Sequence, residues 1–115
     1  MSGRGDIPQS GTTTNPRIYV FGNDYRWRLA SEPIDHPGNQ VDKVSEDLNA
    51  GFGPALQFAT TISDRHPDAV IGLIPCAKDA TSIYEWRRNL SENSLYGSCL
   101  KRVLAASTTG KAAGL

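Results

Sequence analysis

The chain has 115 residues, which suits one small folding unit and is too short for two well-buried cores. Twelve Lys and Arg residues balance twelve Asp and Glu residues, so the chain lacks the net positive charge typical of proteins that bind nucleic acid or anionic membranes. No apolar stretch approaches the roughly 18 to 20 residues of a membrane span, and no signal-peptide pattern follows Met1. We therefore expect one domain without nucleic-acid or membrane partners.

The first half of the chain contains one predicted strand between two loops. Residues 1–16 are rich in Gly, Pro, Ser and Thr, which is typical of a loop. Residues 17–21 are mainly β-branched and aromatic and are followed by a Gly-Asn-Asp turn, which predicts a strand. Residues 25–51 are polar and interrupted by Pro and Gly, so we expect a long connection with at most one helical turn near residues 41–48.

The second half predicts a helix, a strand and another helix. Apolar residues recur at helical spacing after Pro54, which suits a first helical turn, and the helix should end before Pro67. The continuous apolar run of residues 69–74 predicts a strand covered on both faces in a parallel sheet. A second amphipathic helix is marked by Leu95, Cys99, Val103 and Ala106 and should end at the Ser-Thr-Thr-Gly signal of residues 107–110. This order of elements predicts an α/β fold.

Residues 111–115 look like the approach to a further strand. An α/β unit without that strand would leave a sheet edge and apolar helix faces uncovered. We therefore expect this chain to be part of something larger.

The two cysteines, Cys76 and Cys99, are too few for a disulfide framework and lack the clustered spacing of a zinc site. We expect them to be buried free thiols that pack as small apolar groups. They do not identify a cellular compartment.

The segment that leaves the second predicted strand, residues 75–86, is the strongest candidate for a functional site. Ligands collect at the carboxyl ends of parallel strands, and this segment offers polar side chains and backbone amides for an anion or oxyanion. The alternative is an ordinary loop in which Thr81 or Ser82 caps the next turn. Both interpretations remain open on the residues alone.

Three blocks of the sequence resemble a known family in the same order along the chain. They read Glu32-Pro33, then Gly51-Phe52-Gly53-Pro54-Ala55-Leu56-Gln57-Phe58-Ala59, then Ile71-Gly72-Leu73-Ile74-Pro75-Cys76-Ala77 with Thr81-Ser82-Ile83 and Glu85-Trp86. They are similar to the carbohydrate esterase and sialate O-acetylesterase group of the SGNH hydrolases. The resemblance implies that residues 1–115 are part of one such domain, with a loop over residues 1–16 and an α/β body over residues 17–115. It also implies a flavodoxin-like sandwich with a parallel sheet that is incomplete here.

The same resemblance implies a serine esterase, without a cofactor or metal, that removes acetyl groups from carbohydrates such as sialic acid or xylan. In the family the nucleophile lies in a Gly-Gln-Ser-Asn-Met motif, and an Asp-x-x-His motif supplies the acid and the base. This chain begins where the first motif would end and stops before the second. We therefore expect an internal fragment, with a catalytically inert fragment or a carbohydrate-binding remnant as alternatives.

The resemblance places an oxyanion loop at Asp79 and Ala80 and substrate contacts at Thr81, Ser82 and Trp86. The family has a pair of glycines where this chain has Asp79 and Ala80. A backbone amide survives this change, but a residue with a Cβ resists positive φ and a carboxylate opposes a nearby oxyanion. Oxyanion stabilisation should therefore be weakened.

A catalytic triad built from this chain alone is not expected. Ser2 and Ser82 are candidate hydroxyls, and His36 and His66 are the two imidazoles. His66 falls at a predicted helix end, where it should interact with the helix carbonyls. His36 follows Asp35 directly, whereas a triad carboxylate must meet its imidazole through space. Two tryptophans, Trp27 and Trp86, together with the loop around Asp79, keep the carbohydrate-binding alternative open.

Overall fold

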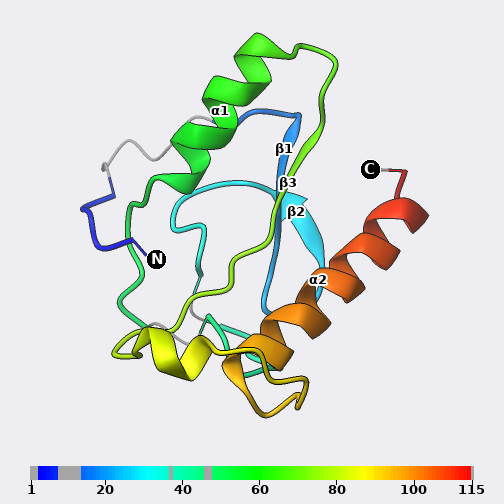
Figure 1. Ribbon diagram of the computed structural model, residues 1–115. Coiled ribbons are helices and arrows are strands. Elements are labelled where there is room, and N and C mark those ends of the chain that lie inside the picture. The colour runs from blue at the N-terminus through cyan, green and yellow to red at the C-terminus, as the bar shows by residue number, and fades with distance from the viewer. Residues whose placement is uncertain (1–2, 8–13, 37, 46–47, 115) are drawn as a thin grey trace.

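The structure, a computed structural model, describes residues 3–7, 14–36, 38–45 and 48–114. Three strands form a mixed sheet in the order β2-β1-β3, flanked by two α-helices and one short 3-10 helix (Figure 1). The elements are β1 (Ile18–Phe21), β2 (Trp27–Leu29), α1 (Ala55–Arg65), β3 (Ile71–Leu73), η1 (Ile83–Trp86) and α2 (Leu95–Ala112). None of the described helices is both long and apolar enough to span a membrane. The predicted α/β class is confirmed.

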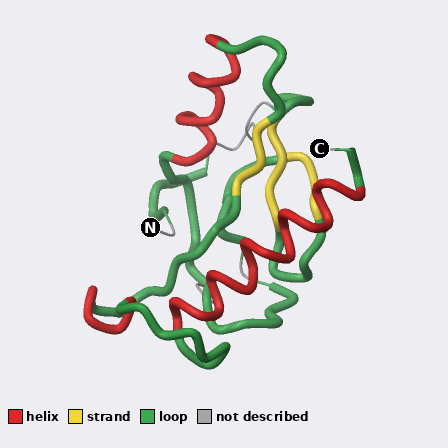
Figure 2. The backbone as a smooth tube through the Cα atoms, turned by 45° about the vertical axis from the view of Figure 1, so that its right-hand side comes forward, coloured by secondary structure: helices red, strands yellow, loops and turns green. Residues whose placement is uncertain are grey.

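The two α-helices cover opposite faces of the sheet (Figure 2). On one face, α1 contacts β1 and β3 over an apolar cluster. The buried members of this cluster are Ile18, Val20, Ala30, Ile34, Leu56 and Ala59. On the other face, the indole Nε1 of Trp27 donates to the carbonyl of Ala106 in α2 over 3.2 Å. Helix α1 therefore packs on β1 and β3, whereas α2 packs on β2.

Strands β1 and β3 pair in parallel, with Ile18 opposite Ile71 and Val20 opposite Leu73. Both strands were predicted, and their parallel pairing agrees with the expected sheet. The prediction that residues 69–74 are covered on both faces is wrong, because Gly72 is exposed and its two neighbours are only half-buried. Strand β3 is the outer strand of the described sheet, which leaves part of it uncovered.

Strand β2 was not predicted, and it makes the sheet mixed rather than fully parallel. It runs antiparallel to β1 after a tight turn in which Tyr25 has a φ of 60°. Three residues carry too little periodicity to identify a strand in a polar segment. The helical turn expected near residues 41–48 is absent from the described residues 41–45 and 48, which have no helical hydrogen bonds.

Helix α1 matches its prediction closely. It follows Pro54 at the N-cap and ends with His66 at the C-cap. The guanidinium of Arg17 binds the last carbonyls of the helix, since its Nη1 donates to those of Ser63 and His66 over 3.3 Å each. The His66 imidazole was expected in this role. Arg17 thereby ties the start of β1 to the end of α1.

Helix α2 is present as predicted and buries Ala106, but it differs from its prediction at its end and in the exposure of Val103. It continues through the Ser-Thr-Thr-Gly segment to Ala112, so the expected stop and the expected approach to a strand at residues 111–114 are wrong; Leu115 lies outside the described residues. Its buried residues are Gly97, Ser98, Arg102, Ala106 and Gly110. Val103 is 39% exposed. The Trp27 ring lies close to Gly110, and the backbone of Ser91 lies close to Gly97, so a side chain at either glycine would meet a neighbour.

Candidate functional site

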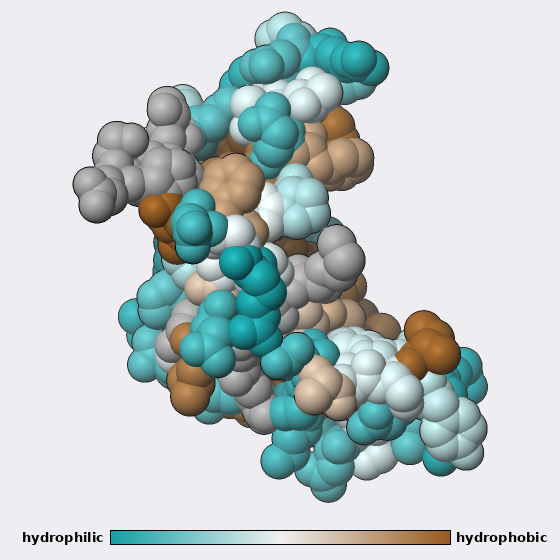
Figure 3. All heavy atoms as spheres, turned by 90° about the vertical axis from the view of Figure 1, so that its left-hand side faces the viewer, coloured by the Kyte–Doolittle hydropathy of each residue, from teal (hydrophilic) through white to brown (hydrophobic). Residues whose placement is uncertain are grey.

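A cleft of about 770 Å³ lies where three distant segments of the chain meet. The segments are the start of the chain, the approach to α1, and the loop that follows β3. The lining residues are Gly3, Arg4, Phe52, Gly53, Pro54, Cys76, Ala77, Lys78, Asp79, Thr81, Ile83 and Trp86. Figure 3 shows this side of the molecule hollowed between an upper and a lower part, with hydrophilic and hydrophobic side chains intermingled. The cleft contains the segment that the sequence identified as the strongest candidate.

The start of the chain forms one wall through backbone hydrogen bonds. Gly5 and Phe52 form an isolated antiparallel bridge, in which the N–H of each donates to the carbonyl of the other over 3.0 and 2.7 Å. Glycine is needed for this close approach, because a Cβ on Gly51 would lie 2.4 Å from the carbonyl oxygen of Gly5. The expected loop at residues 1–16 is therefore held against the approach to α1 over its described residues 3–7.

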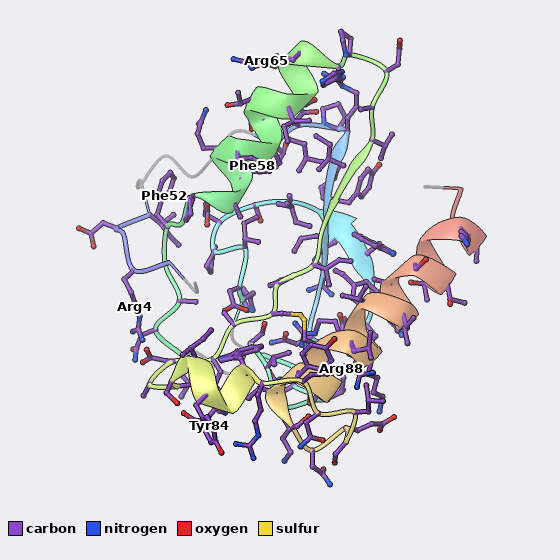
Figure 4. All side chains as sticks on the ribbon, in the orientation of Figure 1. Arg4, Phe52, Phe58, Arg65, Tyr84 and Arg88 are labelled. Atoms are coloured by element: carbon purple, nitrogen blue, oxygen red, sulfur yellow. A yellow bond between two sulfur atoms is a disulfide. The ribbon has the colours of Figure 1, made fainter. Side chains whose placement is uncertain are left out.

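Arg4 joins this wall to the loop after β3. Its Nη2 lies 2.5 Å from the Asp79 carboxylate, and the two side chains are 47% and 64% exposed. Figure 4 shows Arg4 extending from the start of the chain toward that loop. The arginine offsets the negative charge that we expected Asp79 to place near an oxyanion. No sequence pattern indicated this pair, because the two residues are 75 positions apart.

Ala80 adopts a positive φ, which its Cβ was expected to resist. Its φ is 54°, in the left-handed region where a Cβ costs about 1–2 kcal/mol relative to the ordinary helical region. The backbone N–H groups of Asp79 and Ala80 donate no hydrogen bond to any described residue. The loop therefore keeps a strained turn and two backbone donors beside the cleft.

The side chains of Thr81 and Trp86 are hydrogen-bonded to each other within the loop. The Thr81 hydroxyl donates to the carbonyl of Lys78 over 2.8 Å and accepts from the indole Nε1 of Trp86 over 3.1 Å. Both side chains line the cleft and are half-buried. Their expected contacts with substrate stay predictions, while their contacts with each other fix the position of the Trp86 ring.

Ser82 begins the short helix η1, as the alternative interpretation of this loop predicted. Its backbone N–H and its hydroxyl both reach Glu85 Oε2, over 2.7 and 3.0 Å. These hydrogen bonds, the backbone one first, lower the pKa of Glu85 below its ordinary value. The Ser82 hydroxyl is engaged with a carboxylate rather than with an imidazole, so it lacks the base that a nucleophile requires.

A disulfide between Cys76 and Cys99 anchors the beginning of the loop to α2, which corrects the expectation of free thiols. The two Cα atoms are 5.5 Å apart, and the bond appears in yellow in Figure 4. The fold brings the loop after β3 against α2, so these residues are in contact although 23 positions separate them. Sequence spacing alone cannot identify such a pair.

Arg102 of α2 is fully buried and binds the segment below the loop. Its guanidinium makes two hydrogen bonds of 2.9 Å to the carboxylate of Asp42, one of 2.8 Å to the carbonyl of Pro75 and one of 3.0 Å to Ser45 Oγ. The Tyr25 hydroxyl donates to the same carboxylate over 2.9 Å. Burial and this hydrogen bond raise the pKa of Tyr25 to about 12. This network fixes the end of β3, from which the loop starts.

The remaining candidates lie apart from the cleft or outside the described residues. His36 and His66 are exposed, and no hydrogen bond joins either imidazole to a serine among the described residues. Trp27 packs on Phe21 with ring centroids 5.1 Å apart and belongs to the α2 side of the sheet. Ser2 lies outside the described residues. Within the part of the chain that the structure describes, no group of three potential metal ligands occurs.

Comparison with known proteins gives one family. The model of the carbohydrate esterase family of sialic acid-specific acetylesterases matches residues 1–115. A probable carbohydrate esterase of Arabidopsis thaliana is 38% identical over 90 residues, which are 76% of this chain and 31% of that protein. The X-ray structure of this Arabidopsis protein superimposes with a TM-score of 0.73 at 30% identity, over 92% of this chain and 47% of the solved one. The chain thus spans less than half the length of the relative.

Proposed function

Because the chain belongs to the carbohydrate esterase family of sialic acid-specific acetylesterases, we propose that its cleft is the oxyanion side of a carbohydrate O-acetylesterase site. The observation that carries the proposal is the loop at Asp79 and Ala80. Ala80 has a positive φ where the family has glycine, and the two backbone N–H groups have no partner among the described residues. Backbone donors of this kind stabilise the negative oxygen that forms when an ester carbonyl is attacked.

The proposed fold is that of the flavodoxin-like SGNH sandwich, and this chain spans 47% of the solved relative. The parallel pair β1 and β3, with helices on both sheet faces, supports that proposal. The cleft lies at the loop that follows β3, where ligands of parallel sheets usually bind. Strand β2 pairs antiparallel to β1 at the other edge of the described sheet.

The proposed reaction needs groups beyond this loop. A serine hydroxyl attacks the acetyl carbonyl, the sugar leaves with a proton from a histidine, and water then releases acetate from the acyl-enzyme. The Gly-Gln-Ser-Asn-Met and Asp-x-x-His motifs that would supply these groups do not occur among the 115 residues. Loss of one oxyanion donor costs on the order of a hundredfold or more in rate, so the contribution proposed for this chain is a substantial part of the site.

A second candidate function is binding of acetylated carbohydrate without hydrolysis. It is favoured by two aromatic side chains in the cleft lining, Phe52 and Trp86, because aromatic faces bind the C–H faces of sugar rings. Trp27 does not belong to this candidate surface, since its indole is engaged with α2.

The test compares acetylated and deacetylated xylobiose as ligands of the 115-residue chain, followed by NMR shifts of backbone amides. We expect the acetylated sugar to shift the amides of residues 77–86 and to bind more tightly than the deacetylated one. Equal behaviour of the two sugars would refute the proposal. Trp86→Phe should weaken this binding, while Trp27→Phe serves as the matched control away from the cleft.

Hydrolysis of 4-nitrophenyl acetate tests whether the 115 residues hold a nucleophile of their own. The purified chain should show no turnover above background, because its one described candidate hydroxyl in the loop, that of Ser82, is bonded to Glu85. Turnover that Ser82→Ala or Ser2→Ala abolishes would contradict this expectation and would place a nucleophile within these residues.

A further inference from the structure

A second cavity of about 180 Å³ lies beside the cleft. The two cavities share Gly53, Pro54, Cys76 and Ala77 in their linings. Roughly 10–15 Å³ of such volume accommodates one water molecule, so this cavity has room for a larger group. A ligand held in the cleft could therefore extend into it.

Asp35 is the unusual group in the lining of this cavity. Its side chain is 3% exposed, and neither carboxylate oxygen accepts a hydrogen bond from a described residue. A buried carboxylate without donors is costly, so such a group calls for a water, ion or ligand that completes it. The nearby Glu32 differs, because its Oε2 accepts from the backbone N–H of Ile34 over 3.2 Å.

The charge of the cavity indicates which ligand would fit. Its lining contains two carboxylates, from Glu32 and Asp35, and no Lys, Arg or His. Ionised carboxylates accept hydrogen bonds and donate none, so they favour a ligand rich in donors and oppose an anion. The other walls are mainly apolar and belong to Ile34, Pro54, Ala55, Leu73, Ile74, Pro75 and Ala77. A neutral sugar combines hydroxyl donors with apolar C–H faces.

We propose that this cavity is a subsite for a neutral sugar ring, with Asp35 as the acceptor for its hydroxyl groups. The inference rests on the proposed function and specifies its substrate class. The ester would belong to an uncharged sugar such as a xylose unit, because the carboxylate of a sialic acid in this cavity would face two acidic side chains. The acetyl group would then lie in the adjoining cleft, beside Asp79 and Ala80.

The experiment titrates the 115-residue chain with methyl β-D-xylopyranoside and, separately, with N-acetylneuraminic acid. We expect the xyloside to shift the backbone amides of Asp35, Ala55 and Leu73, and the sialic acid to leave them unchanged. Sialic acid shifts at these amides that equal or exceed those of the xyloside would overturn the proposal. This measurement uses the unaltered chain and so does not depend on the folding of any variant.

Asp35→Asn provides the second measurement. Removing the charged acceptor should weaken xyloside binding about tenfold, as expected for a hydrogen bond to a charged group. The matched control is Asp68→Asn, which changes an exposed aspartate outside the cavity and should bind the xyloside as the unaltered chain does. Unchanged xyloside affinity in Asp35→Asn would refute the role of Asp35.

The two proposals fail in different ways. If acetylated xylobiose shifts residues 78–86 while the xyloside leaves Asp35, Ala55 and Leu73 unmoved, the subsite is refuted and the proposed function stands. If the xyloside shifts these three amides but acetylation makes no difference in the cleft, the cavity binds sugar and the esterase assignment is refuted.

Discussion

Two consecutive parts of the chain, residues 75–77 and the loop of residues 78–86, are held in place by different kinds of interaction. Residues 75–77 are fixed from below by a disulfide and by a fully buried arginine. Residues 78–86 are held mainly by short-range hydrogen bonds between neighbours, such as those of Thr81 and Ser82. The contrast indicates a rigid base that positions a locally formed loop. Removing an interaction that holds residues 75–77 should therefore lower the free energy of unfolding more than a substitution in the loop does.

Arg102→Met should produce the largest loss of stability. The substitution leaves the Asp42 carboxylate, which is 2% exposed, without its ionic partner, and breaking one side of a buried pair costs about 3–5 kcal/mol. Urea denaturation followed by circular dichroism measures the change. The exposed Arg88→Met is the matched control and should change stability by less than about 0.5 kcal/mol.

A double variant tests the cause of that loss. Asp42→Asn combined with Arg102→Met removes the stranded charge and should recover part of the stability lost in Arg102→Met. A double variant less stable than the single one would contradict the role of the unpaired carboxylate and would weaken the contrast between base and loop.

Opening the disulfide should have the next largest effect. A bond that spans 23 positions restricts the unfolded chain by about 3 kcal/mol in the chain-entropy model. Cys76→Ser with Cys99→Ser should lower the free energy of unfolding by this amount, and dithiothreitol should lower that of the unaltered chain equally. A chain whose unfolding midpoint is insensitive to dithiothreitol would contradict the covalent tie.

Ala80→Gly should raise the free energy of unfolding rather than lower it. Glycine accepts the positive φ of this position without a steric penalty, so the variant should be more stable by about 1 kcal/mol despite the added freedom of its unfolded chain. Differential scanning calorimetry measures the gain. Ala105→Gly, within α2, is the matched control and should be destabilising by up to about 1 kcal/mol. A loss of stability in Ala80→Gly would show that the loop does not hold Ala80 in this conformation.

The sequence predicted the elements that carry clear local patterns. The apolar run before Pro75 identified β3, and the proline and apolar spacing from Pro54 identified α1. The loop after β3 was recognisable because it joins a strand end to a polar segment that resembles a family motif. The absence of the family's glycine pair drew attention to Asp79 and Ala80, but the positive φ of Ala80 itself was not predicted.

The features that the sequence did not predict depend on contacts between residues far apart along the chain. Arg102 occupies a helix whose apolar spacing suggested a different buried face, and its partners Asp42 and Pro75 are 60 and 27 positions away. The two cysteines are 23 positions apart, and Arg4 and Asp79 are 75 positions apart. A charged residue inside an amphipathic pattern was a usable signal, but only the folded chain identifies its partner.

Asp79→Asn should have the smallest effect on the free energy of unfolding. It tests how strongly the loop of residues 78–86 is held. The pair with Arg4 is well exposed on both sides, and such pairs contribute about 0–1 kcal/mol and weaken with salt. The exposed pair of Lys101 and Glu92, with a 2.8 Å separation, gives a matched control in Glu92→Gln. Urea denaturation at low and high salt should show similar small losses for both variants, which shrink as salt rises. A salt-independent loss above about 2 kcal/mol in Asp79→Asn alone would mean that the start of the chain and the loop form one tightly coupled unit. In that case the rigid base would extend into the cleft wall itself.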